Sequence, residues 1–442
     1  MHTARVIVDL TFGDAGKGSI TDALVRRGAN LVVRYNGGAQ AAHTVIDQTG
    51  RCHIFHQFGS GTLVEGVETL LSRFMMVNPL ALHYEELELR GLGITNAAER
   101  MRIDGHALVT TPYHMIANRL REIARGANRH GSCGLGIGET AADALDFESN
   151  VIRYGNLSIP GLLKRKLAWH RDLKLKQLDE VMPSLLATVG AEKEQVCALL
   201  DQLHSEDEME ATLEVFSHIA ERFQVASPDF LAARMRKPGS TVFEGAQGVL
   251  LDENFGFHPH TTWSNTTPTN ALHLIEEAQS GAQTTVLGLT RAYQTRHGTG
   301  PFPTEAESVT MALPEPHNPT NEWQGPFRAG WLDLSLLRYA IQASGRIDGL
   351  VVTCLDRLQE LPEIKFGNGY RFQGTSWHLN IGIPNSLAAQ EENGKMLRKV
   401  DVVYASAPSD APAYSQAVAD FLRLPLLGTS HGPLAHHKQF AF

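Results

Sequence analysis

Apolar runs of strand length recur along the chain, and each is closed by a polar or glycine-bearing loop. The first run ends at Leu10, a glycine-rich loop follows, and from Ser19 onward Ile20, Ala23 and Leu24 repeat with the spacing of a helix. A strand, a turn and a helix in this order open a βαβ unit, in which the next strand is parallel to the first. Buried-type strands are predicted at residues 6–10, 31–35, 241–243, 285–289 and 350–353. The pattern predicts an α/β fold with a mostly parallel central sheet and helices on both faces.

Between about residues 168 and 236 the pattern changes to long, charged, amphipathic segments. We interpret this part as a helical insertion, and its acid-rich stretch at residues 205–214 as a solvated helix face. No internal repeat or sharp change in composition divides the chain, so a single elaborated α/β domain covering residues 1–442 is predicted. The irregular stretch 314–330 is too long for a passive connection, and we expect it to be a lid or substrate loop.

Composition narrows the range of partners. The 39 Lys and Arg residues and the 48 Asp and Glu residues are mixed along the whole chain, so no basic stripe offers a site for nucleic acid. The four cysteines have no CxxC spacing, which is typical of reduced thiols. No apolar run reaches the roughly eighteen residues of a membrane span. We therefore expect a cytoplasmic protein that contacts neither nucleic acid nor membrane.

The loop at residues 11–18 has the chemistry of a phosphate-binding turn. Its glycines let backbone N–H groups approach phosphate oxygens, Lys17 can reach a β- or γ-phosphate, and the following helix presents its positive end. The turn is P-loop-like but not a Walker motif, because Thr11 and Gly18 stand where that motif has its first glycine and its Ser or Thr. The phosphate-binding candidates in this loop are Gly13, Gly16, Lys17 and Gly18.

Two further side chains in the first loops are candidates for an acid and a base. Asp14 lies inside the phosphate loop, where a carboxylate is repelled unless it binds a metal ion or takes a proton, or else caps the helix. His43 follows the second strand in a loop of small residues. It can act as an acid toward an oxygen that gains negative charge, although an isolated histidine is more often a packed or surface residue.

Three later segments carry polar groups suited to a nucleotide. Gln247 lies in a glycine-flanked turn after a strand and can bind a base edge or a phosphate. The hydroxyl-rich run 261–267 suits phosphate oxygens, or else caps the helix expected at Asn270. Asp356 ends a strand and can accept two hydrogen bonds from the N1 and 2-amino groups of guanine, or cap the next helix.

Taken in order, these segments resemble the adenylosuccinate synthetase family. The resemblance runs from the first strand to the C-terminal loop and implies a ligase of purine biosynthesis that forms a homodimer. It rests on the strings Gly13-Asp-Ala-Gly-Lys-Gly18, Phe243-Glu-Gly-Ala-Gln-Gly248, Ser264-Asn-Thr-Thr267, Gly300-Pro-Phe-Pro-Thr-Glu305, Gly330-Trp-Leu-Asp333 and Thr429-Ser-His-Gly-Pro433.

The resemblance implies a reaction in two steps. In the family, the aspartate that matches Asp14 takes the N1 proton of IMP and, with the carbonyl that matches Ala42, binds Mg²⁺. The histidine that matches His43 stabilises the 6-oxygen as this oxygen receives the γ-phosphoryl group of GTP. The amine of aspartate then displaces phosphate. Gln247 matches a position at the IMP base and completes the implied catalytic set.

The remaining matches imply binding roles. For the triphosphate, the resemblance adds to the first loop the residues Thr44, Asp356, Ser430 and Gly432. For the purine monophosphate and the amino donor, it implies substrate-binding residues Gln40, Cys133, Thr262, Thr304 and Arg328. Of these, Thr304 is implied to support the loop that holds the magnesium site.

The chain departs from the family pattern at residues that bind substrate. Cys133 replaces a phosphate-binding threonine, Leu135 an arginine, and Gln40 an asparagine. Arg328 is the only cation left in a stretch where the family has several arginines that hold both carboxylates of aspartate. Cys354 replaces a lysine beside the guanine-reading position, which makes ATP an alternative to GTP.

Three functions stay open on the sequence alone. The first is the family reaction with IMP and aspartate, and the second is the same chemistry on another purine nucleotide, such as dGMP, or with another amine. The third is a catalytically silent nucleotide-binding regulator. The joint presence of Asp14, Lys17, His43 and Gln247 argues against the regulator, because a protein that only binds has no use for a base and an acid at a phosphate site.

Overall fold

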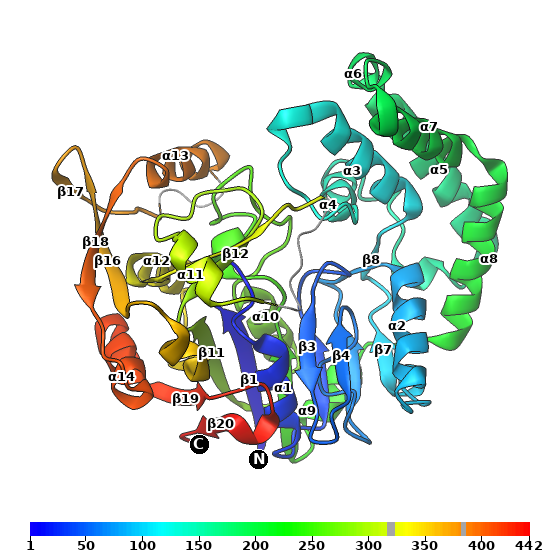
Figure 1. Ribbon diagram of the computed structural model, residues 1–442. Coiled ribbons are helices and arrows are strands. Elements are labelled where there is room, and N and C mark those ends of the chain that lie inside the picture. The colour runs from blue at the N-terminus through cyan, green and yellow to red at the C-terminus, as the bar shows by residue number, and fades with distance from the viewer. Residues whose placement is uncertain (316–322, 382–385) are drawn as a thin grey trace.

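The computed structural model of the chain describes residues 1–315, 323–381 and 386–442. A ten-stranded sheet runs through its centre in the order β20-β19-β15-β11-β1-β10-β2-β5-β7-β9 (Figure 1). All neighbouring strands are parallel except β19 and β20. The predicted, mostly parallel sheet is therefore confirmed. Its strands are β1 (His2–Asp9), β2 (Leu31–Arg34), β5 (Glu68–Leu71), β7 (Met101–Ile103), β9 (Gln224–Val225), β10 (Gly239–Glu244), β11 (Gln283–Arg291), β15 (Gly349–Thr353), β19 (Leu426–Ser430) and β20 (Lys438–Phe440).

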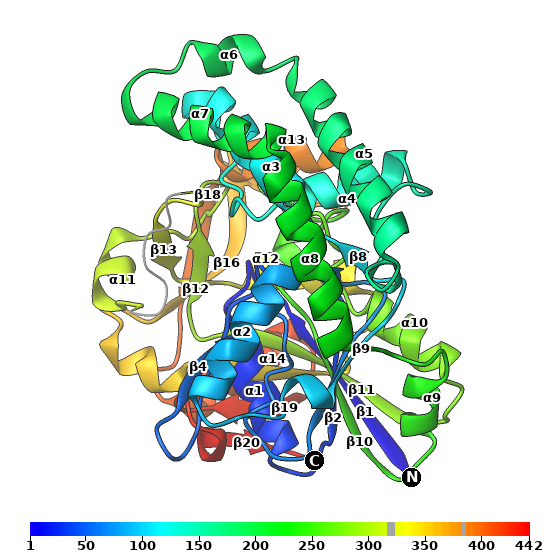
Figure 2. The same ribbon diagram turned by 90° about the vertical axis from the view of Figure 1, so that its right-hand side faces the viewer.

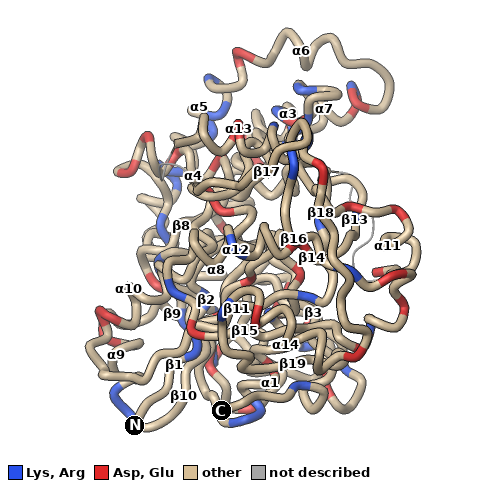
Figure 3. The backbone as a smooth tube through the Cα atoms, turned by 90° about the vertical axis from the view of Figure 1, so that its left-hand side faces the viewer, with Lys and Arg blue, Asp and Glu red and all other residues tan. Residues whose placement is uncertain are grey.

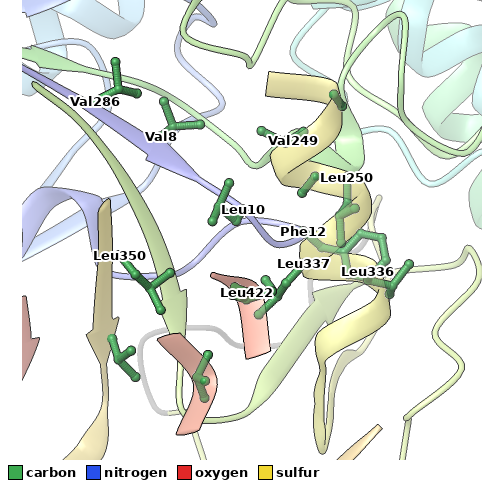
Figure 4. Close-up of a cluster of buried hydrophobic side chains, with 14 of the residues drawn as sticks. Val8, Leu10, Phe12, Val249, Leu250, Val286, Leu336, Leu337, Leu350 and Leu422 are labelled. Carbon is green, nitrogen blue, oxygen red and sulfur yellow. The ribbon is translucent and has the colours of Figure 1, made fainter. Parts of the chain in front are cut away.

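Helices cover both faces of this sheet, as predicted. Successive side chains of a strand point to opposite faces. Ala4, Val6 and Val8 of β1 belong to a core that includes residues of α10, α12 and α14, part of which Figure 4 shows. Ile7 belongs to a second core, with residues of α1. The helices concerned are α1 (Lys17–Val25), α10 (Thr269–Glu277), α12 (Leu334–Ser344) and α14 (Ala411–Leu422).

The first helix begins earlier than the apolar spacing predicted. α1 starts at Lys17, because Gly16 takes a left-handed conformation (φ 81°) that ends the loop. Lys17 therefore lies in the first turn of α1, where backbone N–H groups have no partner within the helix. Because α1 begins at Lys17, the lysine lies at the positive end of the helix.

Helices make up most of the segment 168–236 that was predicted as an insertion, and the first of them, α5, begins at Pro160. Apolar residues of α5, α7 and α8 share a core with α2 and α3, and Figure 2 shows α8 beside α2 and α6 far from the central sheet. β9 returns the chain to the edge of that sheet. These helices are α2 (Pro79–Gly91), α3 (Pro112–Arg125), α4 (Ile137–Asp146), α5 (Pro160–Leu178), α6 (Met182–Leu186), α7 (Gly190–His204), α8 (Glu206–Arg222) and α9 (Phe230–Met235).

The polar pattern did not reveal the smaller sheets. β12 (Gln294–His297) pairs with β13 (Phe327–Gly330), so the end of the stretch predicted as irregular is a strand. Residues 316–322 of that candidate loop lie outside the described residues. The other elements are β3 (His43–Ile46), β4 (Cys52–Phe55), β6 (Met76–Val77), β8 (Leu108–Val109), β14 (Leu332–Asp333), β16 (Lys365–Phe372), β17 (Thr375–Trp377), β18 (Asp401–Ser406), α11 (Glu307–Ala312) and α13 (Leu387–Leu397).

Charged residues are spread over the whole fold. Lys and Arg alternate with Asp and Glu along the backbone in Figure 3. In α8 the acidic side chains of the stretch 205–214 are exposed, whereas Met209 is buried, so this helix has a solvated face as predicted. None of the helices in the described ranges is long and apolar enough to cross a membrane.

Candidate active site

A cavity of about 760 Å³ opens where the loops after β1, β2 and β10 meet. Loops at the carboxyl ends of parallel strands gather at one edge of a sheet, which is the usual place for a ligand site in such a fold. The structure brings nine of the predicted site residues to its wall: Gly13, Asp14, Lys17, Gln40, Ala42, His43, Cys133, Gln247 and Thr262.

Asp9, at the end of β1, organises the first loop. Its Oδ1 accepts hydrogen bonds from the Thr11 backbone N–H (2.9 Å) and hydroxyl (2.7 Å). Its Oδ2 accepts from the Ala15 N–H (2.9 Å) and the Lys17 ammonium (2.7 Å). Both members of the Asp9–Lys17 ion pair are buried. The carboxylate thus fixes the curvature of the loop and holds the lysine at the cavity.

We expect Asp9→Asn to lower the free energy of unfolding by about 3 kcal/mol, because it leaves the buried Lys17 ammonium without its counter-charge. Urea denaturation at neutral pH measures this effect. The matched control is Glu210→Gln, which breaks an exposed pair with Lys164 and should leave the free energy of unfolding nearly unchanged. Equal losses in the two variants would show that Asp9 does not organise the loop.

Asp14 and Gln247 face the cavity from strained backbone positions. Their φ angles are 61° and 56°, in the left-handed region that side-chain-bearing residues rarely adopt. A Cβ at Gly248 would lie 2.1 Å from the Thr11 carbonyl oxygen, so the turn that carries Gln247 packs directly on the first loop. Such strain persists where surrounding structure enforces it, and it is common at functional sites.

His43 is held by a buried glutamate that the sequence did not single out. Its Nδ1 lies 2.7 Å from Glu244 Oε1, at the end of β10, and the Glu244 carboxylate also accepts from the Ser60 N–H (3.0 Å) and hydroxyl. Burial raises the pKa of Glu244, but His43, Arg34 and the Ser60 N–H outweigh it and lower the pKa to about 2. A charged Glu244 fixes the proton of His43 on Nδ1 and leaves Nε2 for the cavity.

Burial is also the largest influence on the pKa of His43, which it lowers, although the Glu244 carboxylate opposes the shift. A Cβ at Gly18 would lie 2.7 Å from the Cβ of His43, so the second loop lies tightly on the start of α1. This close approach explains why glycine, rather than Ser or Thr, stands at position 18.

A third wall of the cavity carries the residues predicted for the monophosphate. Both polar atoms of the Gln40 amide are buried and have no hydrogen-bond partner in the described part of the chain. Burial raises the pKa of the Cys133 thiol, which therefore stays neutral. Cys133 precedes α4, whose first residues, with Thr262, also line the cavity. Polar groups without partners beside a helix N-terminus suit an anionic ligand.

Asp356, Ser430 and Gly432 lie outside this cavity, at the carboxyl ends of β15 and β19. Their strands are on the opposite side of β1 from β10 and β2. The Thr353 hydroxyl of β15 donates to the Ala15 carbonyl (3.0 Å), which joins this second group to the first loop. The phosphate loop thus lies between the cavity and the predicted base site.

Five other predicted residues do not line the cavity: Gly16 and Gly18 of the first loop, Thr44, Thr304 and Arg328. Thr44 lies in β3 next to His43, and Thr304 is buried, with its carbonyl accepting from the Trp331 N–H (3.1 Å). Arg328 pairs with the Glu305 carboxylate and donates to the Gly300 carbonyl (3.2 Å). Their substrate roles stay predictions.

Two residues at the wall were not predicted from the sequence. His297 Nε2 lies 3.6 Å from Asp14 Oδ2 and is a second imidazole beside the proposed base. Arg296 stacks over Phe12, with 4.1 Å between the guanidinium and the ring centre, and its pKa is lowered by burial. The string Thr295-Arg-His297 lies next to the Gly-Pro-Phe-Pro-Thr-Glu run, and that proximity was the available signal.

A cluster with metal-ligand chemistry lies behind α4. His114, Asp143 and His170 are buried together, but Thr111 N–H donates to His114 Nδ1 (2.9 Å), so His114 Nε2 carries the proton that it donates to Asp143 Oδ2 (3.1 Å). That nitrogen has no lone pair for a metal ion. Lys174 Nζ, 2.7 Å from Asp143 Oδ1, already supplies a positive charge. The cluster is a structural network that joins α3, α4 and α5.

We expect this network to make the fold sensitive to acid. Burial lowers the pKa of His114 from 6.5 to about 3, so below pH 6.5 the unfolded chain binds a proton that the folded chain does not. The pKa of Asp143 is also lowered, since the His114 and His170 bonds and Lys174 outweigh burial, and its contribution too is lost as pH falls.

The free energy of unfolding should therefore fall by up to about 1.4 kcal/mol per pH unit between pH 6.5 and 4 because of His114, and the contribution of Asp143 is lost only near and below its ordinary pKa of 3.8. Urea denaturation at several pH values measures this slope. His114→Gln should give a shallower slope, whereas His106→Gln, at an exposed turn, should keep it. An unchanged slope in His114→Gln would contradict the assignment.

The parallel sheet, the phosphate-type loop and the acid and base candidates at one cavity define a nucleotide-dependent α/β enzyme. The sequence model of the family described as adenylosuccinate synthetase matches residues 6–435. The chain belongs to the adenylosuccinate synthetase family and is a carbon–nitrogen ligase of purine biosynthesis.

Relatives and solved structures agree with this assignment. The adenylosuccinate synthetase of Clostridium beijerinckii is 32% identical over 84% of this chain and 82% of its own length. That of Francisella tularensis subsp. mediasiatica is 28% identical over 97% and 96%. The fully ligated enzyme of Plasmodium falciparum has the same fold, with a TM-score of 0.74, 22% identity and 99% coverage of both chains.

A second solved structure shares the fold at greater distance. The succinoaminodeoxyadenylate synthetase of cyanophage S-2L, bound to dGMP and to dATP as an energy donor, has a TM-score of 0.61 and 15% identity. The match covers 100% of this chain and 95% of that one.

Proposed function

We propose that this ligase acts on IMP and aspartate and uses GTP to activate the 6-oxygen of the purine. The observation that carries the proposal is the meeting of Asp14, His43 and Gln247 on one cavity, beside the phosphate loop and Lys17. A base, an acid and a phosphate-holding lysine are the groups that phosphorylation of an amide-like oxygen needs.

The residues act in order along the reaction. Asp14 takes the N1 proton of IMP, so that electron density moves to the 6-oxygen. This oxygen attacks the γ-phosphorus, and the bond to the β-γ bridging oxygen breaks. His43, whose Nδ1 lies 2.7 Å from Glu244, must be doubly protonated to donate a hydrogen bond from Nε2 to the 6-oxygen as negative charge develops there, and the Glu244 carboxylate favours this form against burial. The amine of aspartate then attacks C6, and phosphate leaves with the former 6-oxygen.

The donor set at Asp14 and Ala42 fits a magnesium ion. Mg²⁺ prefers oxygen ligands and binds through one or two protein groups together with phosphate oxygens. The Asp14 carboxylate is partly exposed, and Ala42 lines the same cavity. When bound there, the ion would neutralise phosphate charge, and it would hold Asp14 near the γ-phosphoryl group.

The triphosphate extends from the first loop toward β15 and β19. Lys17 and the N–H groups at the start of α1 hold its phosphates, and Asp356, Ser430 and Gly432 hold its base. Asp356 is exposed and free to accept the N1 and 2-amino protons of guanine, which adenine cannot offer together. This difference favours GTP, with ATP as the alternative that Cys354 leaves open.

Of the three substrates, the amino donor has the fewest candidate binding residues at the cavity. Arg328 is ion-paired with Glu305 and does not reach the cavity wall, so aspartate requires either release of this pair or other donors. Arg296 lines the wall on the same pair of strands, and its guanidinium donates to the Thr299, Pro301 and His260 carbonyls. We propose aspartate as the donor, with a weaker carboxylate clamp than several arginines would give.

Phosphate release tests these assignments with a panel of 6-oxopurine monophosphates, amines and triphosphates. Release that requires IMP and aspartate together supports the proposal. Release only with another purine, such as dGMP, or with another amine would show that the substrate is different from the one proposed. No release with any combination would contradict catalysis. Product mass identifies the amine that was added.

The proposal extends to the whole molecule. We propose that residues 1–442 act as one domain with a helical insertion, that two copies form a homodimer, and that the protein works in the cytoplasm. Sedimentation at micromolar concentration tests the dimer, and a monomer with full activity would contradict it.

A further inference from the structure

The C-terminal loop is built around one buried lysine. Lys438 opens β20, directly opposite Ser430 in the antiparallel pair with β19, and its side chain is 2% exposed. Its ammonium donates to three successive carbonyls, of Gly432 (2.7 Å), Pro433 (2.8 Å) and Leu434 (3.1 Å). All three of its N–H donors are used, so this charge is directed at the loop and not at a ligand.

Other contacts of the loop depend on the same arrangement. The His431 N–H donates to the His437 carbonyl (3.0 Å), and the Ser430 hydroxyl donates to the Gly432 carbonyl (3.2 Å). A Cβ at Gly432 would lie 2.3 Å from His437 Nδ1, so the loop closes without room for a side chain there. The short helical turn of the loop, residues 435–437, packs on α1, the helix that begins with Lys17.

Lys438 also balances the charges of the base site. Burial lowers the pKa of Lys438 to about 8, and the charges of Cys354 and Asp356 at the end of β15 and of Asp22 in α1 oppose this shift. β15 pairs with β19 (Val352 with Thr429) and β19 with β20 (Ser430 with Lys438), so Lys438 and the end of β15 that precedes Asp356 lie at the same edge of the sheet.

We propose that Lys438 is a positioning residue for the base of the triphosphate. Its hydrogen bonds to the carbonyls of residues 432–434 hold the C-terminal loop in place, and this fixes Ser430 and Gly432 relative to Asp356. The inference rests on the proposed role of these three residues as the base site. Without the ammonium, three carbonyls lose a charge-assisted partner at once, and the loop is free to move away from the base.

The affinity of the full-length protein for a non-hydrolysable GTP analogue, measured by calorimetry, tests the inference without turnover. Lys438→Met should weaken binding of the analogue by about tenfold or more, and leave the affinity for IMP within about twofold. Lys193→Met, at an exposed position of α7, is the matched control and should change neither. Unchanged affinity for the analogue in a folded Lys438→Met protein would overturn the inference.

A second pair of variants separates this inference from the proposed base site. Asp356→Ala should also weaken binding of the GTP analogue. If it does not, the proposed location of the base site is wrong. If Asp356→Ala weakens binding and Lys438→Met does not, only the role of Lys438 fails. Should Lys438→Met not fold, Lys438→Gln supplies two N–H donors without charge. A loss of affinity of about threefold or more then supports the role, and wild-type affinity overturns it.

Discussion

Replacement of Asp14 by asparagine is expected to lower kcat about 1000-fold or more and to leave triphosphate affinity within about threefold. Asparagine has nearly the same size but cannot take the N1 proton, so the 6-oxygen stays a poor nucleophile. Asp14 lies in the first loop, yet its own contact among the described residues is with His297 at 3.6 Å, and the loop is held by Asp9 instead. The fold of the loop should therefore survive the change. Phosphate release under saturating substrates gives kcat, and calorimetry gives the affinity.

The control for this change is Asp207→Asn, on the exposed face of α8, which should leave both quantities unchanged. A kcat for Asp14→Asn within about tenfold of the wild type would remove Asp14 as the base. A loss of triphosphate affinity as large as the loss of kcat would assign Asp14 to binding instead.

Glu244→Gln is expected to lower kcat about 100-fold or more, with little change in the KM of any substrate. The glutamine carbonyl can still accept from His43 Nδ1, so the ring keeps its orientation. What is lost is the buried negative charge that favours a doubly protonated imidazole when the 6-oxygen becomes negative. Because that charge matters most in the transition state, the effect should appear in kcat.

Ser60→Ala separates this electrostatic role from packing. Ser60 donates to the same carboxylate from its N–H and hydroxyl, and among the described residues no hydrogen bond joins it to His43. Its loss should lower kcat by no more than about fivefold. Equal losses in Ser60→Ala and Glu244→Gln would show that the pocket, and not the charge on His43, is what matters.

The parts of the fold that the sequence predicted are those set by short-range periodicity. The strands that became β1, β2, β10, β11 and β15 are apolar runs buried on both faces, so their pattern is strong. The loops after them carry the candidate residues, because parallel strands end at one edge. For this reason nine predicted site residues meet at one cavity.

The parts that escaped prediction depend on contacts between distant segments. Glu244 meets His43 across 201 residues, and nothing local marks a glutamate at a strand end as the partner of a histidine in another loop. Asp9 looks like the last residue of a strand, and its four hydrogen bonds exist only once the loop curls back over it. The ion pair of Arg328 with Glu305 likewise exists only in the folded chain, and the substrate role of Arg328 stays a prediction.

The central claim is that the 6-oxygen of the purine is phosphorylated and then leaves as part of phosphate. IMP labelled with ¹⁸O at C6, incubated with GTP and aspartate in ordinary water, tests it directly by mass spectrometry of the released phosphate. The account predicts one labelled oxygen in each phosphate formed and an unlabelled nucleotide product. Unlabelled phosphate, with a nucleotide that keeps its ¹⁸O, would contradict it.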